Sequence, residues 1–220
     1  MRLRRGLRGR NLGTSGASRH CVVYHCAWAN APDSFSRVRP EPYLPARVGF
    51  EALAELDCVD WSSLSHAYGR GVVGEDISGD VARSLALIRG DTRTALVDGL
   101  WSNVCHQGTV YEASAYALPF IAATAAGHVP AESRSLLVAL LGDIAVGGSH
   151  VAPGGSYAGS FGEGVDLLIR DTVRRCEGYL AHIEEAEPAK APLIAAIRLV
   201  TTEPSDDHRK AVLDLIDPED

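Results

Sequence analysis

Residues 110–146 read VYEASAYALPFIAATAAGHVPAESRSLLVALLGDIAV, and this stretch decides the fold class. In its second half, apolar residues recur at helical spacing and form one continuous face: Leu136, Leu137, Leu140, Leu141 and Ile144. Gly127 closes the first half and Pro130 fits the start of the second, because glycine favours a helix end and proline a helix start. The stretch therefore predicts two helices, 110–126 and 131–146, whose short link makes them antiparallel neighbours.

Similar patterns precede and follow this pair of helices. The sequence predicts a short helix over 61–68 and longer helices over 77–89, 92–104, 165–186, 193–201 and 208–216. Short links pair the neighbouring helices, and corresponding helices of successive pairs lie about 30–50 residues apart, the range of helical solenoid repeats. A single hairpin leaves an apolar face exposed, and stacking buries it. We therefore expect an all-α fold, an α–α superhelix of antiparallel helical hairpins, with a compact six- or seven-helix bundle as the alternative.

The first 47 residues differ from the rest of the chain. Nine arginines stand against Asp33 and Glu41, which gives this segment a net charge of +7. An Arg/Gly run leads into a Ser/Gly/Thr stretch and then a proline-rich one, and no helical or strand period persists through them. We expect residues 1–47 to be a disordered or mis-assigned N-terminal extension, and residues 48–220 to form the helical repeat domain.

Charge and cysteine usage limit the partners and the compartment. Residues 48–220 hold 12 basic and 26 acidic residues, a net charge of −14 that repels a phosphate backbone, so we expect no nucleic-acid partner. No apolar run reaches the ~18 residues that a membrane-spanning helix needs, so we expect no membrane partner either. The five cysteines are odd in number and scattered. This usage is typical of free thiols in a reducing compartment and predicts a cytoplasmic protein.

Two segments resemble a known family. Residues 50–69 contain Val59-Asp-Trp-Ser-Ser-Leu-Ser-His-Ala-Tyr-Gly69, and residues 100–120 contain His106-Gln-Gly-Thr-Val-Tyr111 followed by Leu118-Pro-Phe120. Both are similar to segments of actinobacterial HEAT-repeat proteins with an armadillo-like helical domain. The resemblance covers about residues 50–146. It implies a HEAT-like fold and no particular reaction.

The segment from His106 to Glu112 is the strongest candidate for a site. It gathers an imidazole, an amide, a hydroxyl, a phenol and a carboxylate within seven residues. His106 and Glu112 could act as an acid–base pair, which needs groups within hydrogen-bond reach that titrate near neutral pH. A structural interpretation competes with this one, because Thr109 and Glu112 have the spacing of a Thr-x-x-Glu capping box.

Other polar or aromatic residues join the candidates for binding a partner or ligand. Asp143 lies in an otherwise apolar helix and needs a partner, for which Arg134 and His106 are the options. The candidate set is Trp101, His106, Gln107, Tyr111, Glu112, Asp143 and His66. The chain lacks the phosphate-loop, zinc-protease, serine-hydrolase and paired Cys-x-x-Cys motifs. We therefore predict no catalytic residue, no metal ligand and no cofactor.

These observations favour a non-enzymatic protein that binds an unidentified protein partner. A form of this hypothesis is an immunity or antitoxin-like protein, whose acidic domain would suit a toxin. The alternative is a small enzyme or ligand-binding protein with a pocket around His106, Tyr111 and Glu112. A third possibility, a helical-repeat DNA glycosylase, requires a basic groove, and the charge of −14 over residues 48–220 argues against it.

Overall fold

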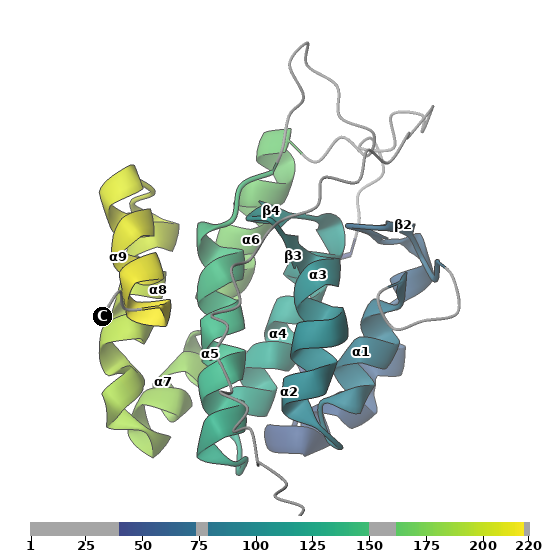
Figure 1. Cartoon of the computed structure of the whole chain (residues 1–220), viewed down its shortest axis with the longest axis horizontal. Coiled ribbons are helices and arrows are strands. Elements are labelled where there is room, and N and C mark those ends of the chain that lie inside the picture. The colour runs from purple at the N-terminus through teal and green to yellow at the C-terminus, as the bar shows by residue number, and fades with distance from the viewer. Residues whose placement is uncertain (1–39, 74–78, 150–161, 218–220) are drawn as a thin grey trace, which may run out of the picture. The chain divides into compact units, whose positions relative to one another are not determined.

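The computed structural model describes residues 40–73, 79–149 and 162–217 and is mostly helical in these ranges (Figure 1). The chain divides into two compact units, 1–30 and 31–220, and only the second contains described residues. The predicted all-α class is confirmed to this extent, with two short β-hairpins added. The N-terminal extension before residue 40 lies outside the described residues.

In the described residues, short helices and longer ones alternate with four strands of two residues each. In chain order they are the 3₁₀ helix η1 (Gly49–Cys58), the 3₁₀ turn η2 (Trp61–Ser63), β1 (Ser65–His66), β2 (Gly69–Arg70), α1 (Val81–Leu87), α2 (Thr92–Ala95), the π-helical turn η4 (Leu96–Leu100), α3 (Trp101–Val104), β3 (Cys105–His106), β4 (Thr109–Val110), α4 (Glu112–Ala126), α5 (Ala131–Val146), α6 (Gly162–Arg175), α7 (Glu177–Ala186), the 3₁₀ turn η5 (Pro188–Lys190), α8 (Ala191–Thr202) and α9 (Asp206–Ile216).

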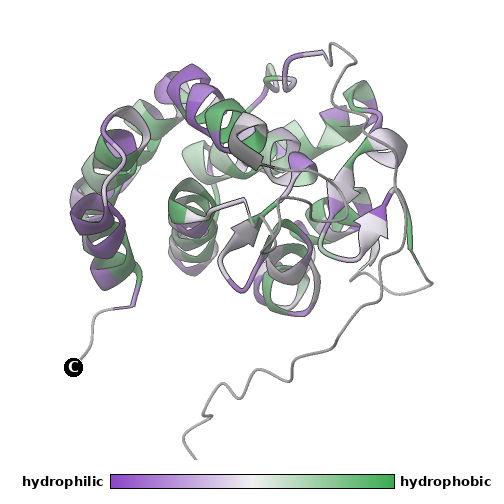
Figure 2. Ribbon diagram, turned by 90° about the horizontal axis from the view of Figure 1, so that it is seen from above, coloured by the Kyte–Doolittle hydropathy of each residue, from purple (hydrophilic) through white to green (hydrophobic). Residues whose placement is uncertain are grey.

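Helix α4 is the centre of the core. All of its residues are buried, and it packs against η1, α5, α6 and α7. Phe120 is fully buried on it and receives Tyr43 and Trp61, with ring centroids 6.2 and 5.8 Å away. Such a helix carries small and apolar residues on all sides, because every face meets another element. Figure 2 shows the complementary pattern in the outer helices, whose hydrophilic residues lie mostly on outward-facing sides.

The predicted helix pairs occur in the structure. Helix α1 packs against α2 and η4, α4 against α5, and α6 and α7 against α8. Between pairs, α4 contacts α1 on one side and α6 and α7 on another, while α5 contacts α2 and α8. Helix α9 covers α5 and α8, and it approaches α5 closely because Gly142 has no side chain. A Cβ at Gly142 would lie 2.7 Å from Ile216 Cδ1.

Element boundaries agree with the sequence in some places and differ in others. The helix predicted over 131–146 is confirmed, whereas the one predicted over 165–186 is divided between α6 and α7 at Cys176. The helix predicted over 92–104 contains a π-helical turn in its middle. The helix predicted over 61–68 is wrong, since a single 3₁₀ turn is followed there by the strand β1.

Residues 40–47, which composition groups with the N-terminal extension, pack on the helical domain. The Tyr43 hydroxyl donates to Glu55 Oε2 at 2.8 Å, and the backbone N–H of Ala46 donates to the same oxygen at 2.8 Å. The hydroxyls of Tyr116 and Tyr179 donate to the backbone carbonyls of Pro40 and Pro45. The change from a basic to an acidic sequence at residue 47 therefore does not coincide with the start of the packed region, because Tyr116 and Tyr179 bind residues 40–47 to the domain.

Among the described residues, no helix has both the length and the apolar composition that crossing a bilayer requires.

Candidate functional site

Two β-hairpins built on the same sequence pattern lie at one end of α3 (Figure 1). In the first, Ser65 pairs with Arg70 and His66 with Gly69; in the second, Cys105 pairs with Val110 and His106 with Thr109. Each hairpin follows a Trp-Ser dipeptide, and each histidine stands five residues after its tryptophan, Trp61 or Trp101. The two segments therefore repeat one Trp-Ser-x-x-x-His pattern with an offset of 40 residues.

The first hairpin is fixed by a buried carboxylate from far along the chain. Glu112, only 7% exposed, accepts hydrogen bonds through Oε2 from the Ser65 backbone N–H at 3.3 Å and from the Ser65 hydroxyl at 3.0 Å. The backbone N–H of Ala67 donates to the Asn103 carbonyl at 3.0 Å. A buried carboxylate loses its hydration, so these donors stabilise it as well as the strand.

His66 fixes the first hairpin from inside. Its Nδ1 accepts from the Tyr68 backbone N–H at 3.2 Å, so the ring proton must lie on Nε2, which donates to the Gly71 carbonyl at 2.7 Å. Burial lowers the pKa of His66 and outweighs the opposing effects of the Gly71 hydrogen bond and the charge of Asp80. His66 is therefore held neutral, with both nitrogens engaged.

The second hairpin presents a tight turn to the outside. Gln107 and Gly108 have φ of 54° and 77°, which makes this a turn of the type I′ class that matches the twist of a hairpin. Both residues are exposed. The chain after α5 runs beside β4, where the Val110 N–H donates to the Gly148 carbonyl at 3.2 Å and the Gly148 N–H to the Gly108 carbonyl at 3.0 Å.

The predicted Thr109–Glu112 capping box is wrong. Thr109 belongs to β4, and α4 begins at Glu112 with Tyr111 as its N-cap. Ser114 Oγ accepts the Tyr111 backbone N–H at 2.7 Å and donates to the Val104 carbonyl at 2.5 Å. The capping function therefore passes to Ser114, and the Glu112 carboxylate is used by the first hairpin instead.

The two hairpins meet through three rings, which we call the ring cluster: His66, Tyr68 and His106. The Tyr68 ring centroid lies 6.4 Å from that of His66 and 6.1 Å from that of His106, the second contact being edge-on. Tyr68 and His106 are half-buried, whereas His66 is buried. The cluster thus joins a fixed histidine to a more accessible one. Sequence analysis did not select Tyr68 as a candidate, although the 40-residue repeat marks its hairpin.

The remaining candidates lie around this arrangement. Trp101 is half-buried and packs against the hydrophobic core, and Tyr111 is 5% exposed. Asp143 is half-buried, and its backbone carbonyl accepts from Cys105 Sγ at 3.5 Å. Burial, and secondarily the Asp143 charge, raise the pKa of Cys105 to about 12, so this thiol stays protonated at neutral pH.

Arg134, one of the two partners expected for Asp143, is used elsewhere. It stands nine residues before Asp143 on the same helix, about 13 Å along the axis. Its guanidinium donates to the carbonyls of Ala125 and Gly127, both at 2.9 Å, and lies 3.5 Å from Glu187 Oε2. Arg134 therefore joins the α4–α5 link to the end of α7.

Within the described ranges, no group of three or more histidine, cysteine, aspartate or glutamate side chains is placed to hold a metal ion. Comparisons with protein-family models, with curated proteins and with solved structures found no match for this chain.

Proposed function

We propose that this chain is a HEAT-like α–α superhelical module that binds a protein partner through its second hairpin. The helix contacts support this architecture: α4 lies between α1 and the α6–α7 pair, and α5 lies between α2 and α8. In stacked helical hairpins, each helix meets its own partner and the equivalent helices of neighbouring repeats. Such modules function by presenting turns and loops at the edges of the stack.

The proposal rests mainly on the backbone conformation of Gln107. Its φ of 54° lies in the left-handed region, where a residue with a side chain is less stable than glycine by roughly 1 kcal/mol. Glycine, asparagine or aspartate usually occupies such a position. A glutamine with this backbone conformation at an exposed hairpin tip supports a role for its side chain in contact with a partner.

Residues near this tip have the composition of an interface. We define the hairpin face as Tyr68, Arg70, Val72, His106 and Gln107. Val72 is 66% exposed, the highest value among the large apolar side chains of the described residues. Tyrosine and arginine are enriched where proteins meet, because each combines a large contact area with hydrogen bonding. The hairpin face therefore suits a protein surface better than a small molecule.

The net charge of the domain defines the partner more closely. Residues 48–220 carry a net charge of −14, which attracts a protein with a basic surface and speeds its association. An immunity or antitoxin-like role, with a basic toxin as the partner, is the form of the proposal that this charge favours. Salt would slow the association without abolishing it.

The enzyme alternative has less support from the geometry. It requires His106, Tyr111 and Glu112 to surround one pocket that a substrate can enter. Tyr111 and Glu112 are buried, and the Glu112 carboxylate holds Ser65. A carboxylate that stabilises a strand is poorly placed to exchange protons with a substrate.

Site-specific photocrosslinking in the native host tests the proposal. A photoreactive amino acid at position 107 is expected to capture one protein in stoichiometric amount, with a basic surface. The matched control places the same amino acid at Leu213, which is 46% exposed on α9. Capture of the same proteins from both positions, or of none from position 107, would contradict the proposal.

A further inference from the structure

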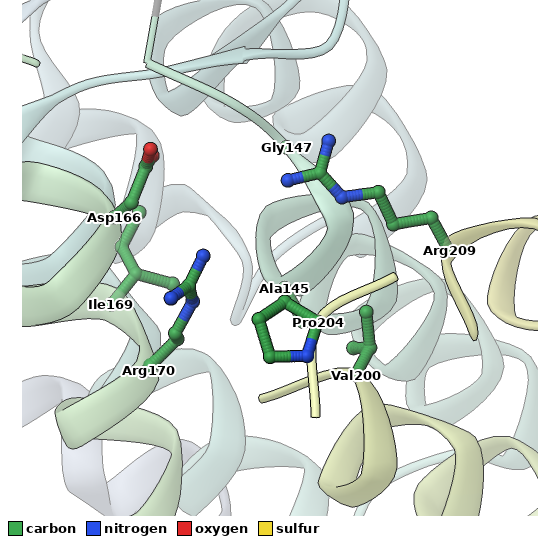
Figure 3. A pocket seen from close by; sticks show the side chains of 8 residues that line it. All are labelled: Ala145, Gly147, Asp166, Ile169, Arg170, Val200, Pro204 and Arg209. Atoms are coloured by element: carbon green, nitrogen blue, oxygen red, sulfur yellow. The ribbon is translucent and has the colours of Figure 1, made fainter. Parts of the chain in front are cut away.

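A second feature, away from the hairpin face, is a small hollow between α5, α6, α8 and α9 (Figure 3). Arg170 on α6 and Arg209 on α9 extend into it from different sides, and Asp166 lies beside Arg170. Its lining residues are Ala145, Gly147, Asp166, Ile169, Arg170, Val200, Pro204 and Arg209. The hollow has about 10 Å³ of space that the centre of a water molecule can reach.

The two arginines have no partner among the described residues. Neither guanidinium makes a hydrogen bond or an ion pair there, whereas Arg198 on α8 bridges Glu177 and Glu184 at 2.7 Å. Lys210, the neighbour of Arg209, lies 2.6 Å from Asp214. Two unpaired cations that share one hollow are unexpected in a domain with 26 acidic residues and only 12 basic ones.

Asp166 explains why Arg170 is unpaired. The two residues are four apart on α6, the spacing at which an aspartate and an arginine usually pair. The Asp166 carboxylate instead accepts from the Ser149 backbone N–H at 2.9 Å and from the Ser149 hydroxyl at 3.1 Å. The Asp166 carboxylate is thus engaged by Ser149, and the Arg170 guanidinium remains available to a ligand.

We propose that this hollow is a binding site for a small phosphoryl compound, with Arg170 and Arg209 holding its phosphoryl oxygens. The accessible space admits about one water-sized group, so one oxygen enters while the others stay at the mouth between the guanidiniums. Two forks that approach from two helices match a tetrahedral dianion, whereas a planar carboxylate is satisfied by one fork. With Asp166 in the same lining, the two arginines leave the hollow a net formal charge of +1, which attracts an anion.

Titration with inorganic phosphate tests this site, with ionic strength held constant by sodium chloride. Binding is followed by the NMR signals of the arginine side chains in the full chain. We expect wild-type protein to bind phosphate, and Arg170→Gln and Arg209→Gln each to weaken binding about tenfold or more, the effect of losing a charge-assisted contact. Arg93→Gln is the matched control, because Arg93 on α2 is exposed and pairs with Glu132 on α5.

Each other outcome would overturn the site. Absence of phosphate binding to the wild type would do so, and so would equal binding to the wild type and to the doubly substituted protein. Acetate that binds as tightly as phosphate would contradict the assignment of a phosphoryl group. Circular dichroism of each variant separates a lost site from a lost fold, and Arg170 and Arg209 are partly exposed and make no side-chain hydrogen bond or ion pair with the described residues.

Discussion

The two hairpins have the same strand length and the same Trp-Ser-x-x-x-His segment, yet they differ in how they are held. The first is tied to the interior by Glu112 and by the two nitrogens of His66. The second ends in an exposed turn whose glutamine has a left-handed backbone. The first copy of this segment therefore stabilises the domain, and we propose that the exposed turn of the second presents side chains to a partner.

Glu112→Ala is expected to have the largest effect on this comparison. It leaves the Ser65 N–H and hydroxyl without an acceptor in the interior, and we expect a loss of about 2–3 kcal/mol in the free energy of unfolding. Urea denaturation measures the loss, and Glu112→Gln serves as the control because an amide oxygen still accepts both bonds. A change below about 0.5 kcal/mol for the alanine variant would show that Glu112 does not fix the first hairpin.

His66 should make the stability of the first hairpin depend on pH. Its pKa is lowered in the folded protein, so the stability it contributes is present above the unfolded value of 6.5 and is lost as pH falls through the folded value. His66→Gln should remove this component and lower the free energy of unfolding at pH 7.5 by about 1–2 kcal/mol. Unfolding of both proteins between pH 7.5 and pH 5 checks the sign. The same acid dependence in both proteins would exclude His66 as its source.

Gly108→Ala tests the turn of the second hairpin. A Cβ at Gly108 would meet no atom within 4 Å, so the expected loss of about 1 kcal/mol comes from the φ of 77° alone. Thermal unfolding monitors it. Gly148, which also has open space around it but no positive φ, supplies a matched alanine variant with a smaller expected loss. Equal losses at the two positions would argue against strain at the tip.

Gln107→Gly should have the smallest effect on stability, with the opposite sign. Glycine relaxes the backbone at φ 54°, and we expect the free energy of unfolding to rise by about 0.5 kcal/mol or to stay unchanged. Chemical denaturation beside the wild type measures this change. A clear fall would mean that the Gln107 side chain stabilises the domain itself.

Sequence patterns predict those parts of this fold that depend on local signals. Gly127 ends α4 and Pro130 caps the start of α5, as the sequence predicts, and four of the five apolar residues named for the α5 face are buried, Leu136 being the exception. The segment 61–68 was misassigned because Ser65 is held by Glu112, which lies 47 residues further along the chain. No local window contains both partners, so a helical pattern there could not reveal the strand.

For the candidate site too, local sequence predicts some features, while others depend on tertiary contacts. The segment from His106 to Glu112 was recognised by its residue types, but their distribution between β4, the N-cap and the first hairpin depends on tertiary contacts. Tyr68 could have been found by aligning Trp61–His66 with Trp101–His106, since the 40-residue offset is visible in the sequence. The hollow between Arg170 and Arg209 could not, because it depends on how α5, α6, α8 and α9 pack together.

The most direct test compares the affinity of wild-type and Gln107→Gly protein for the partner captured from position 107. We predict that the variant unfolds at the same or a higher denaturant concentration and binds at least about tenfold more weakly, a loss of 1.4 kcal/mol. Unchanged affinity in a fully folded variant would contradict the claim that the second hairpin presents Gln107 to a partner.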